Sequence, residues 1–250
     1  MIVHDERNPR AHAMREKLDQ SLPEGHDDPA VMLVIGGDGF LLQTAATHGW
    51  DKVYLGLNAG QLGFLLNDVT DWSWTANAIR ESRWTAHAFP LLEARIETED
   101  GSIRTELALN DVYLERMTGQ TARLALTIDG HRAVEKLVAD GVIVSTALGS
   151  TAYAYSAGGL VCHPTLRVMT VTPICPHLPR LPPIALPEDA SIHVEVRAGE
   201  HRPVRAVADG REINRVHTVR IGVSATQASL AFFTGNDFTA RLIGKLLGTA

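Results

Sequence analysis

The sequence has few cysteines and no long apolar run. Its two cysteines, Cys162 and Cys175, are too few for a disulfide framework in 250 residues, and no Cys/His cluster has zinc-site spacing. No apolar run approaches the ~20 residues needed to span a bilayer. Residues 1–5 lack the basic and apolar regions of a secretory signal. We therefore expect a cytoplasmic protein with no membrane partner and no metal site built from clustered side chains.

The sequence also lacks an excess of basic residues. A net charge of −6 at pH 7 argues against a nucleic-acid partner, because such a surface needs a basic face. Small anionic nucleotides stay possible, since backbone N–H groups and a divalent cation can hold phosphates. The length allows one large domain or two small ones. The 45% hydrophobic and 21% charged content is that of an ordinary globular protein.

The first third of the chain alternates strand and helix patterns. Apolar runs at residues 31–35 and 53–57 predict short buried strands. Helices are predicted over residues 9–20, 40–48 and 72–81. This alternation indicates a parallel α/β layer, so we predict a Rossmann-like parallel α/β domain over residues 1–88.

The pattern changes near Pro90. Asp-Gly pairs at residues 100–101, 129–130 and 209–210 separate strand-like stretches, and each predicts a hairpin. We predict an antiparallel, sandwich-like β domain over residues 89–235. Helical spacing of apolar residues after Asp237 predicts a C-terminal helix, so residues 236–250 are expected to return to the first domain.

The first candidate site is the run Gly36-Gly37-Asp38-Gly39, between a predicted strand and a predicted helix. Glycines let backbone N–H groups approach an anion, and a helix N-terminus offers more of them, so the run resembles a phosphate cradle. Asp38 would repel a phosphate, which suggests that it binds a metal ion or accepts a proton. The alternative is an ordinary turn with Asp38 as N-cap. The run matches neither a Walker A loop nor Gly-x-Gly-x-x-Gly.

Three further runs have both a functional and a structural interpretation. Residues 58–65 form a glycine loop after the second strand, and Asn110-Asp111 follows an apolar run. Taken singly, each fits a plain turn. Asp140-Gly141 precedes an apolar strand, and hydroxyls crowd around Gly149 before a short helix at residues 152–157. Hydroxyls, glycine and a helix start again suit a nucleotide, whereas a chance Ser/Thr-rich loop is the alternative.

Together, these runs resemble the NAD kinase (ATP-NAD 2′-phosphotransferase) family. Its members carry Gly-Gly-Asp-Gly, then Asn-x-Gly-x-Leu-Gly-Phe-Leu, then Asn-Glu, then Asp-Gly-x-Ile-Val-Ser-Thr-Pro-Thr-Gly-Ser-Thr-Ala-Tyr-x-x-Ser-Ala-Gly-Gly. This chain matches them in order at residues 36–39, 58–65, 110–111 and 140–159. The run Thr172 to His177 and the C-terminal tail are also similar to the family, so the resemblance spans most of the chain.

The resemblance implies roles for individual residues. Asp38 would be the catalytic carboxylate, with Gly36, Gly37 and Gly39 holding phosphates. Asn110, Asp111 and Phe64 would contact the adenosine part of NAD, and Asp140 the nicotinamide end, often across a subunit contact. The adenine and ribose would be lined by Thr151, Ala152, Tyr153 and Ser156. NAD and ATP would be the substrates, with Mg²⁺ or another divalent metal as cofactor, in a homodimer or homotetramer.

Three departures from the family pattern stand out. Phe40 replaces a frequent Thr, Asp111 a usual Glu, and Ala147-Leu148 a Pro-Thr pair. They remove no charged catalytic group but affect the expected contacts with the phosphoryl donor. Two other functions therefore stay open: a lipid kinase of the diacylglycerol or sphingosine type, which shares the glycine turn, and a non-catalytic NAD(P)-binding regulator.

Overall fold

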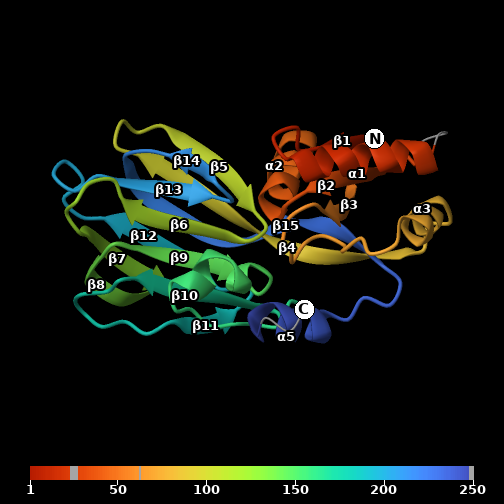
Figure 1. Ribbon diagram of the computed structural model, residues 1–250. Coiled ribbons are helices and arrows are strands. Elements are labelled where there is room, and N and C mark those ends of the chain that lie inside the picture. Colours follow the sequence, from red (N-terminus) through yellow and green to blue (C-terminus); the bar gives the residue numbers. More distant parts are fainter. Residues whose placement is uncertain (23–27, 62, 248–250) are drawn as a thin grey trace. The chain divides into compact units, whose positions relative to one another are not determined.

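The computed structural model describes residues 1–22, 28–61 and 63–247 (Figure 1). The chain divides into two compact units, Met1–Phe89 with Gln227–Ala250, and Pro90–Thr226. Strands β4 (Trp84–Thr98) and β15 (Val216–Phe233) each continue from one unit into the other. We expected the second domain to end at residue 235; the second unit ends at Thr226, because the last part of β15 pairs with a strand of the first unit. Leu62 and the last three residues lie outside the described chain.

The first unit contains the parallel sheet that the sequence predicts. Its other strands are β1 (Ile2–His4), β2 (Val31–Gly36) and β3 (Val53–Asn58), and its helices are α1 (Pro9–Ser21), α2 (Asp38–His48), α3 (Trp72–Arg80) and α5 (Phe238–Leu247). The strands pair in parallel in the order β1-β2-β3-β15. All six residues of β2 are buried, which explains its unbroken apolar run. The three-residue strand β1 was not predicted.

The second unit is built from antiparallel strands, again as predicted. Its strands are β5 (Ile103–Ala108), β6 (Asp111–Arg116), β7 (Ala122–Ile128), β8 (His131–Ala139), β9 (Gly141–Thr146), β10 (Val168–Ile174), β11 (Ile184–Pro187), β12 (Ile192–Val196), β13 (Val204–Ala208) and β14 (Arg211–Ile213). One sheet has the order β11-β10-β9-β6-β13-β14, and β5, β4, β15, β12, β7 and β8 pair in another. The three Asp-Gly pairs lie in the turns β4–β5, β7–β8 and β13–β14.

One apolar core fills the second unit. Val112 and Val144 come from the first of these sheets, and Leu124 and Val219 from the other, yet all belong to a single buried cluster. Contact between the inner faces of two sheets is what defines a sandwich, so the sandwich-like prediction is confirmed. Among the helices in the described ranges, none is both long and apolar enough to cross a bilayer.

The C-terminal helix returns to the first unit, as predicted, through an aromatic cluster. The ring of Phe238 lies edge-on to the rings of His87 and Phe232, each with a centroid separation of 5.1 Å, and to Phe89 at 6.0 Å. Edge-to-face aromatic pairs add to the stabilisation from area burial. This contact fixes the start of α5 beside the end of β15.

We expect Phe238→Ala to lower the free energy of unfolding by about 2 kcal/mol, less than for a fully buried Phe because Phe238 is half-buried. The matched control is Ile243→Ala on the same helix, where the side chain is 49% exposed; there we expect less than about 0.5 kcal/mol. Urea denaturation measures both. Equal losses in the two variants would show that the aromatic cluster does not anchor α5.

Candidate active site

A glycine turn joins β2 to α2 in the first unit. Gly37 is the N-cap, with φ −102° and ψ 173°, and no side chain caps the helix. Asp38 is therefore the first helical residue and not the N-cap, so that structural alternative is not realised. A Cβ on Gly36 would lie 2.7 Å from Cδ1 of Phe40, which requires glycine at position 36 while the ring is there. The result is a helix N-terminus without a capping side chain, a geometry that suits an anion.

The Asp38 carboxylate binds a loop from elsewhere in the chain. Its Oδ2 accepts the N–H of Phe64 at 2.7 Å, and its Oδ1 accepts the N–H of Leu65 at 3.1 Å. Each carboxylate oxygen has further lone-pair capacity, so Asp38 can still accept a proton or contact an ion. The structure thus brings Phe64 to Asp38 through its backbone, whereas the expected contact of the Phe64 ring with adenosine stays a prediction.

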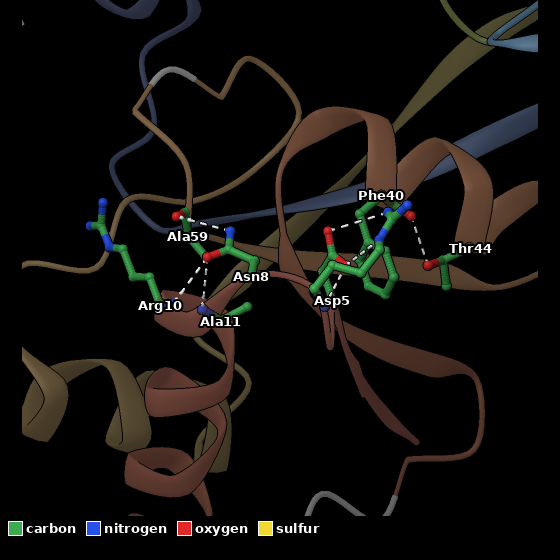
Figure 2. Close-up of polar contacts among 8 residues, drawn as sticks. Asp5, Asn8, Arg10, Ala11, Phe40, Thr44 and Ala59 are labelled. Carbon is green, nitrogen blue, oxygen red and sulfur yellow. Dashed lines mark hydrogen bonds and ion pairs between the residues drawn. The ribbon is translucent and has the colours of Figure 1, made fainter.

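The loop after β3 is held by side-chain amides. Asn58 is buried; its Nδ2 donates to Asp68 at 2.8 Å, and its Oδ1 accepts the N–H of Gly60 at 2.8 Å. A Cβ on Gly63 would lie 3.1 Å from Cγ of Asn58. Figure 2 shows a second anchor, in which Asn8, the N-cap of α1, donates to the carbonyl of Ala59. The glycines of residues 58–65 are therefore explained by packing within their own loop.

Phe40 lies on the first turn of α2, and its carbonyl accepts the Thr44 hydroxyl at 2.8 Å (Figure 2). Phe40 and Gln43 line a cavity of ≈ 460 Å³ together with His4, the last residue of β1, and Asp5, which follows it. Ligand cavities commonly have 300–1,000 Å³. The replacement of the family's Thr by Phe40 thus puts an aromatic wall, in place of a hydroxyl, beside the glycine turn.

In the second unit, Asn110 and Asp111 lie where β5 leads into β6, and a carboxylate from another hairpin holds their backbone. Asp209 Oδ2 accepts the N–H of Leu109 at 2.6 Å, and its Oδ1 accepts those of Asn110 and Asp111 at 3.0 and 3.2 Å. The sequence marked Asp209 only as part of a turn. Its contact with residues a hundred positions earlier could not be read from local pattern.

The loop after β9 contacts the same segment, at Leu109 and Asn110. The Thr146 hydroxyl donates to the carbonyl of Leu109 at 2.7 Å and accepts the N–H of Gly149 at 3.0 Å. A Cβ on Gly149 would lie 1.9 Å from the carbonyl oxygen of Asn110, so only glycine fits there. The structure therefore brings the third and fourth sequence motifs into direct contact.

The Asp111 carboxyl is an unusual acid. Its residue is 5% exposed. Burial, followed by the nearby charge of Asp209, raises the pKa of Asp111 to about 7, and a hydrogen bond from the backbone N–H of Tyr153 opposes this shift. Tyr153 also packs edge-on against Tyr113, with ring centroids 4.8 Å apart. A carboxyl that titrates near neutral pH, next to two aromatic rings, is typical of a functional site.

The hydroxyls around Gly149 differ in their surroundings. Ser150 is buried; its hydroxyl donates to Ala147 O at 2.6 Å and accepts the Cys162 N–H at 2.9 Å, which ties two stretches of chain together. The Thr151 hydroxyl donates to Leu148 O at 3.2 Å. Part of the Ser/Thr enrichment is therefore structural. Ser156, the last residue of α4 (Tyr153–Ser156), is exposed, and Ala152 lies just before that helix.

The structure does not bring Asp140 to Asn110 and Asp111. Asp140 precedes β9, and its Oδ1 accepts Nε of Arg116 at 2.7 Å. Arg116, the partner of Asp140, and Asp111 stand at opposite ends of β6. At a rise of about 3.3 Å per residue, these two positions lie ~16 Å apart along the strand. Arg116 as the partner of Asp140 was not foreseen.

Comparison with known proteins agrees with these motifs. Residues 109–235 match the family model described as the ATP-NAD kinase C-terminal domain. An NAD kinase of Xanthomonas campestris pv. campestris (strain 8004) is 37% identical over 221 residues, which covers 87% of this chain and 85% of that protein. An NAD kinase of Rhizobium meliloti (strain 1021) is 35% identical, with the same two coverages of 87% and 85%.

Solved structures show the same fold. A yeast NADH kinase complexed with NADH has a TM-score of 0.82, with 23% identity, 99% of this chain covered and 86% of that one. An NAD kinase from Archaeoglobus fulgidus in complex with ATP has a TM-score of 0.78, with 24% identity and coverages of 98% and 97%. At these identities, the likeness concerns the fold.

The raised pKa of Asp111, about 7 against 3.8, predicts a pH-dependent stability. Between about pH 4 and pH 7 the folded protein keeps a proton that the unfolded chain releases, so Asp111 makes the free energy of unfolding fall as the pH rises through this range. In Asp111→Asn this loss is absent. The free energy of unfolding of the variant, relative to that of wild type, should therefore be higher at pH 8 than at pH 5 by at least ~1.4 kcal/mol, the value of one pKa unit.

Urea denaturation at both pH values measures this difference. Asp189→Asn, which changes an exposed carboxylate in the same unit, is the control. Its free energy of unfolding should differ from that of wild type by the same small amount at pH 5 and at pH 8. If the difference between Asp111→Asn and wild type is the same at pH 5 and pH 8, Asp111 does not titrate in this range.

Proposed function

The chain belongs to the NAD kinase family, and from this premise we propose that it transfers the terminal phosphoryl group of ATP, or of another phosphoryl donor, to the 2′-hydroxyl of the adenosine ribose of NAD, forming NADP. The observation that carries the proposal is the packing of the loop at Gly149 onto the Asn110–Asp111 backbone. A glycine turn alone occurs in several kinase classes. The second assembly, which consists of the Asn110–Asp111 segment and the Gly149 loop packed on it, supplies in addition a carboxyl group and neighbouring aromatic rings for a nucleoside.

The chemistry requires alignment and charge neutralisation more than covalent catalysis. In the proposed step, the 2′-oxygen of NAD forms a bond to the terminal phosphorus as the bond to the leaving diphosphate oxygen breaks, and the 2′-hydroxyl proton passes to Asp38. Two backbone N–H groups fix the Asp38 carboxylate without consuming all its lone pairs. The glycine turn before it leaves room for donor phosphates.

A divalent ion fits this site only together with the donor. Among the described residues, no group of three or more His, Cys, Asp or Glu side chains could hold one. Mg²⁺ is usually bound by one or two carboxylates, water and substrate phosphates; in the alternative role of Asp38, as a metal positioner instead of a general base, its carboxylate would join that set. The ion would supply neutralisation of the phosphate charges.

Two further proposals concern the assembly and its surroundings. We propose a homodimer or homotetramer. Asp140 and Asp111 lie far apart within one copy of the chain, so they contact the same NAD molecule more readily when a second copy supplies Asp140. Size-exclusion chromatography with light scattering tests this. We propose a cytoplasmic setting because both cysteines are free thiols, one buried and one exposed, which suits a reducing compartment.

Asp38→Asn should lower kcat by at least ~10²-fold, on the scale of a lost general base, while NAD still binds. A coupled assay of NADP formation measures turnover, and calorimetric titration with NAD is the binding control. Asn keeps one acceptor oxygen for the loop N–H groups, so the loop is changed as little as possible. Near-normal turnover would remove Asp38 from the chemical step.

Asp111→Ala should raise KM for NAD more than KM for ATP, because Asp111 belongs to the second assembly and not to the glycine turn. An effect confined to ATP would assign this pair to the donor. The same assay separates the alternatives: a lipid kinase would phosphorylate diacylglycerol or sphingosine and not NAD, and a regulator would bind NAD or NADP with no turnover from any donor.

A further inference from the structure

Arg241 lies on α5, near the end of the chain, yet its side chain reaches the loop that Asp38 binds. Its Nη1 donates to the carbonyl of Leu66 and, at 3.4 Å, to the carbonyl of Gly63. Its Nε donates to Oδ1 of Asn236 at 3.1 Å. The guanidinium also lies over the ring of Phe232, with Cζ 5.1 Å from the centroid. Four contacts therefore fix the orientation of this cation.

A single peptide group connects Arg241 to Asp38. The carbonyl of Gly63 and the N–H of Phe64 belong to the same peptide unit and point in opposite directions, because the bond is trans. The carbonyl accepts from Arg241, and the N–H donates to the Asp38 carboxylate at 2.7 Å. The peptide dipole is thus aligned between a cation and an anion. Hydrogen bonds in such a chain polarise and strengthen one another.

Charge and burial agree with this geometry. Burial lowers the pKa of Arg241, and the charges of Asp68 and Asp38 act in the opposite direction. Arginine remains protonated in proteins despite such shifts. The first unit therefore holds a permanent, partly desolvated positive charge within electrostatic reach of Asp38, although the two residues are 203 positions apart in the sequence.

We propose that Arg241 is a positioning residue for phosphoryl transfer: through the Gly63–Phe64 peptide it orients the Asp38 carboxylate. This rests on the proposed function, in which Asp38 accepts the proton of the 2′-hydroxyl. The structural alternative is that Arg241 only docks α5 onto its unit. The two differ in whether loss of the Arg241 contacts lowers kcat while KM for NAD stays the same.

Loss of the bond to the Gly63 carbonyl should leave the Phe64 N–H less firmly held toward the Asp38 carboxylate. A residue that orients the catalytic carboxylate without touching substrate lowers kcat and leaves KM for NAD nearly unchanged. A residue that only docks α5 lowers the free energy of unfolding without producing this split between kcat and KM.

The test uses Arg241→Gln and Arg241→Lys, with Arg10→Gln as the matched control. Arg10 also donates its Nη1 to a carbonyl of this loop, that of Gly60 at 3.0 Å, but the adjoining peptide does not lead to Asp38. Arg241→Gln should lower kcat by about 10- to 100-fold, the scale of a sub-ångström to 1 Å misplacement, and leave KM for NAD within about twofold.

Arg241→Lys keeps the charge but loses the fork geometry, so its kcat should lie between those of wild type and Arg241→Gln. Arg10→Gln should match wild type in kcat and in KM for NAD. A kcat of Arg241→Gln within about twofold of that of Arg10→Gln would overturn the proposal. Where that variant does not fold, wild-type kcat together with wild-type hydrogen exchange at Phe64 in Arg241→Lys would do so.

Hydrogen exchange of the Phe64 amide, followed by NMR without any substrate, is the second readout. It should be faster in Arg241→Gln than in Arg10→Gln, because only the first variant weakens the chain of bonds to Asp38. If wild type forms no NADP from any donor, the proposed function fails, and the exchange result still decides whether Arg241 holds the loop on Asp38.

Discussion

Hydrogen bonds from backbone N–H groups to carboxylates organise the candidate residues within each of the two units. Loop N–H groups outside the strand ladders need partners of their own, and an ionised carboxylate is a strong acceptor for several at once. Asp38 takes two such groups from the loop after β3, and Asp209 takes three from the segment that leads into β6. In each case a distant stretch of chain is fixed to within hydrogen-bonding distance.

These two carboxylates have different consequences for their neighbours. Burial of Asp111, and after it the charge of the half-buried Asp209, disfavours ionisation of Asp111, so that carboxyl titrates near neutral pH. Below that pH Asp111 carries a proton and can donate a hydrogen bond, and above it Asp111 only accepts. Asp38, by contrast, is connected to a cation through one peptide group.

The departures from the family pattern also acquire a physical interpretation. Phe40 walls a cavity beside the glycine turn, and Leu148 is buried, so neither is a neutral exchange for Thr. A threonine at position 148 would place its hydroxyl at a buried position, with the Leu148 carbonyl already accepting from Thr151. Both substitutions change local packing and leave the glycine positions on which the close backbone approaches depend.

The sequence by itself determined the elements and the class of chemistry. Buried apolar runs predicted β2 and β3, Asp-Gly pairs predicted three hairpins, and ordered motifs pointed to the family, because each of these signals is local. Only the tertiary structure decided which residues meet. It joined Asp209 to Asn110, Arg241 to the loop at Asp38, and Arg116 to Asp140. Such contacts bridge up to about 200 residues, and no spacing rule records them, because they arise where β-strand ends and loops from separate parts of the chain are packed against one another.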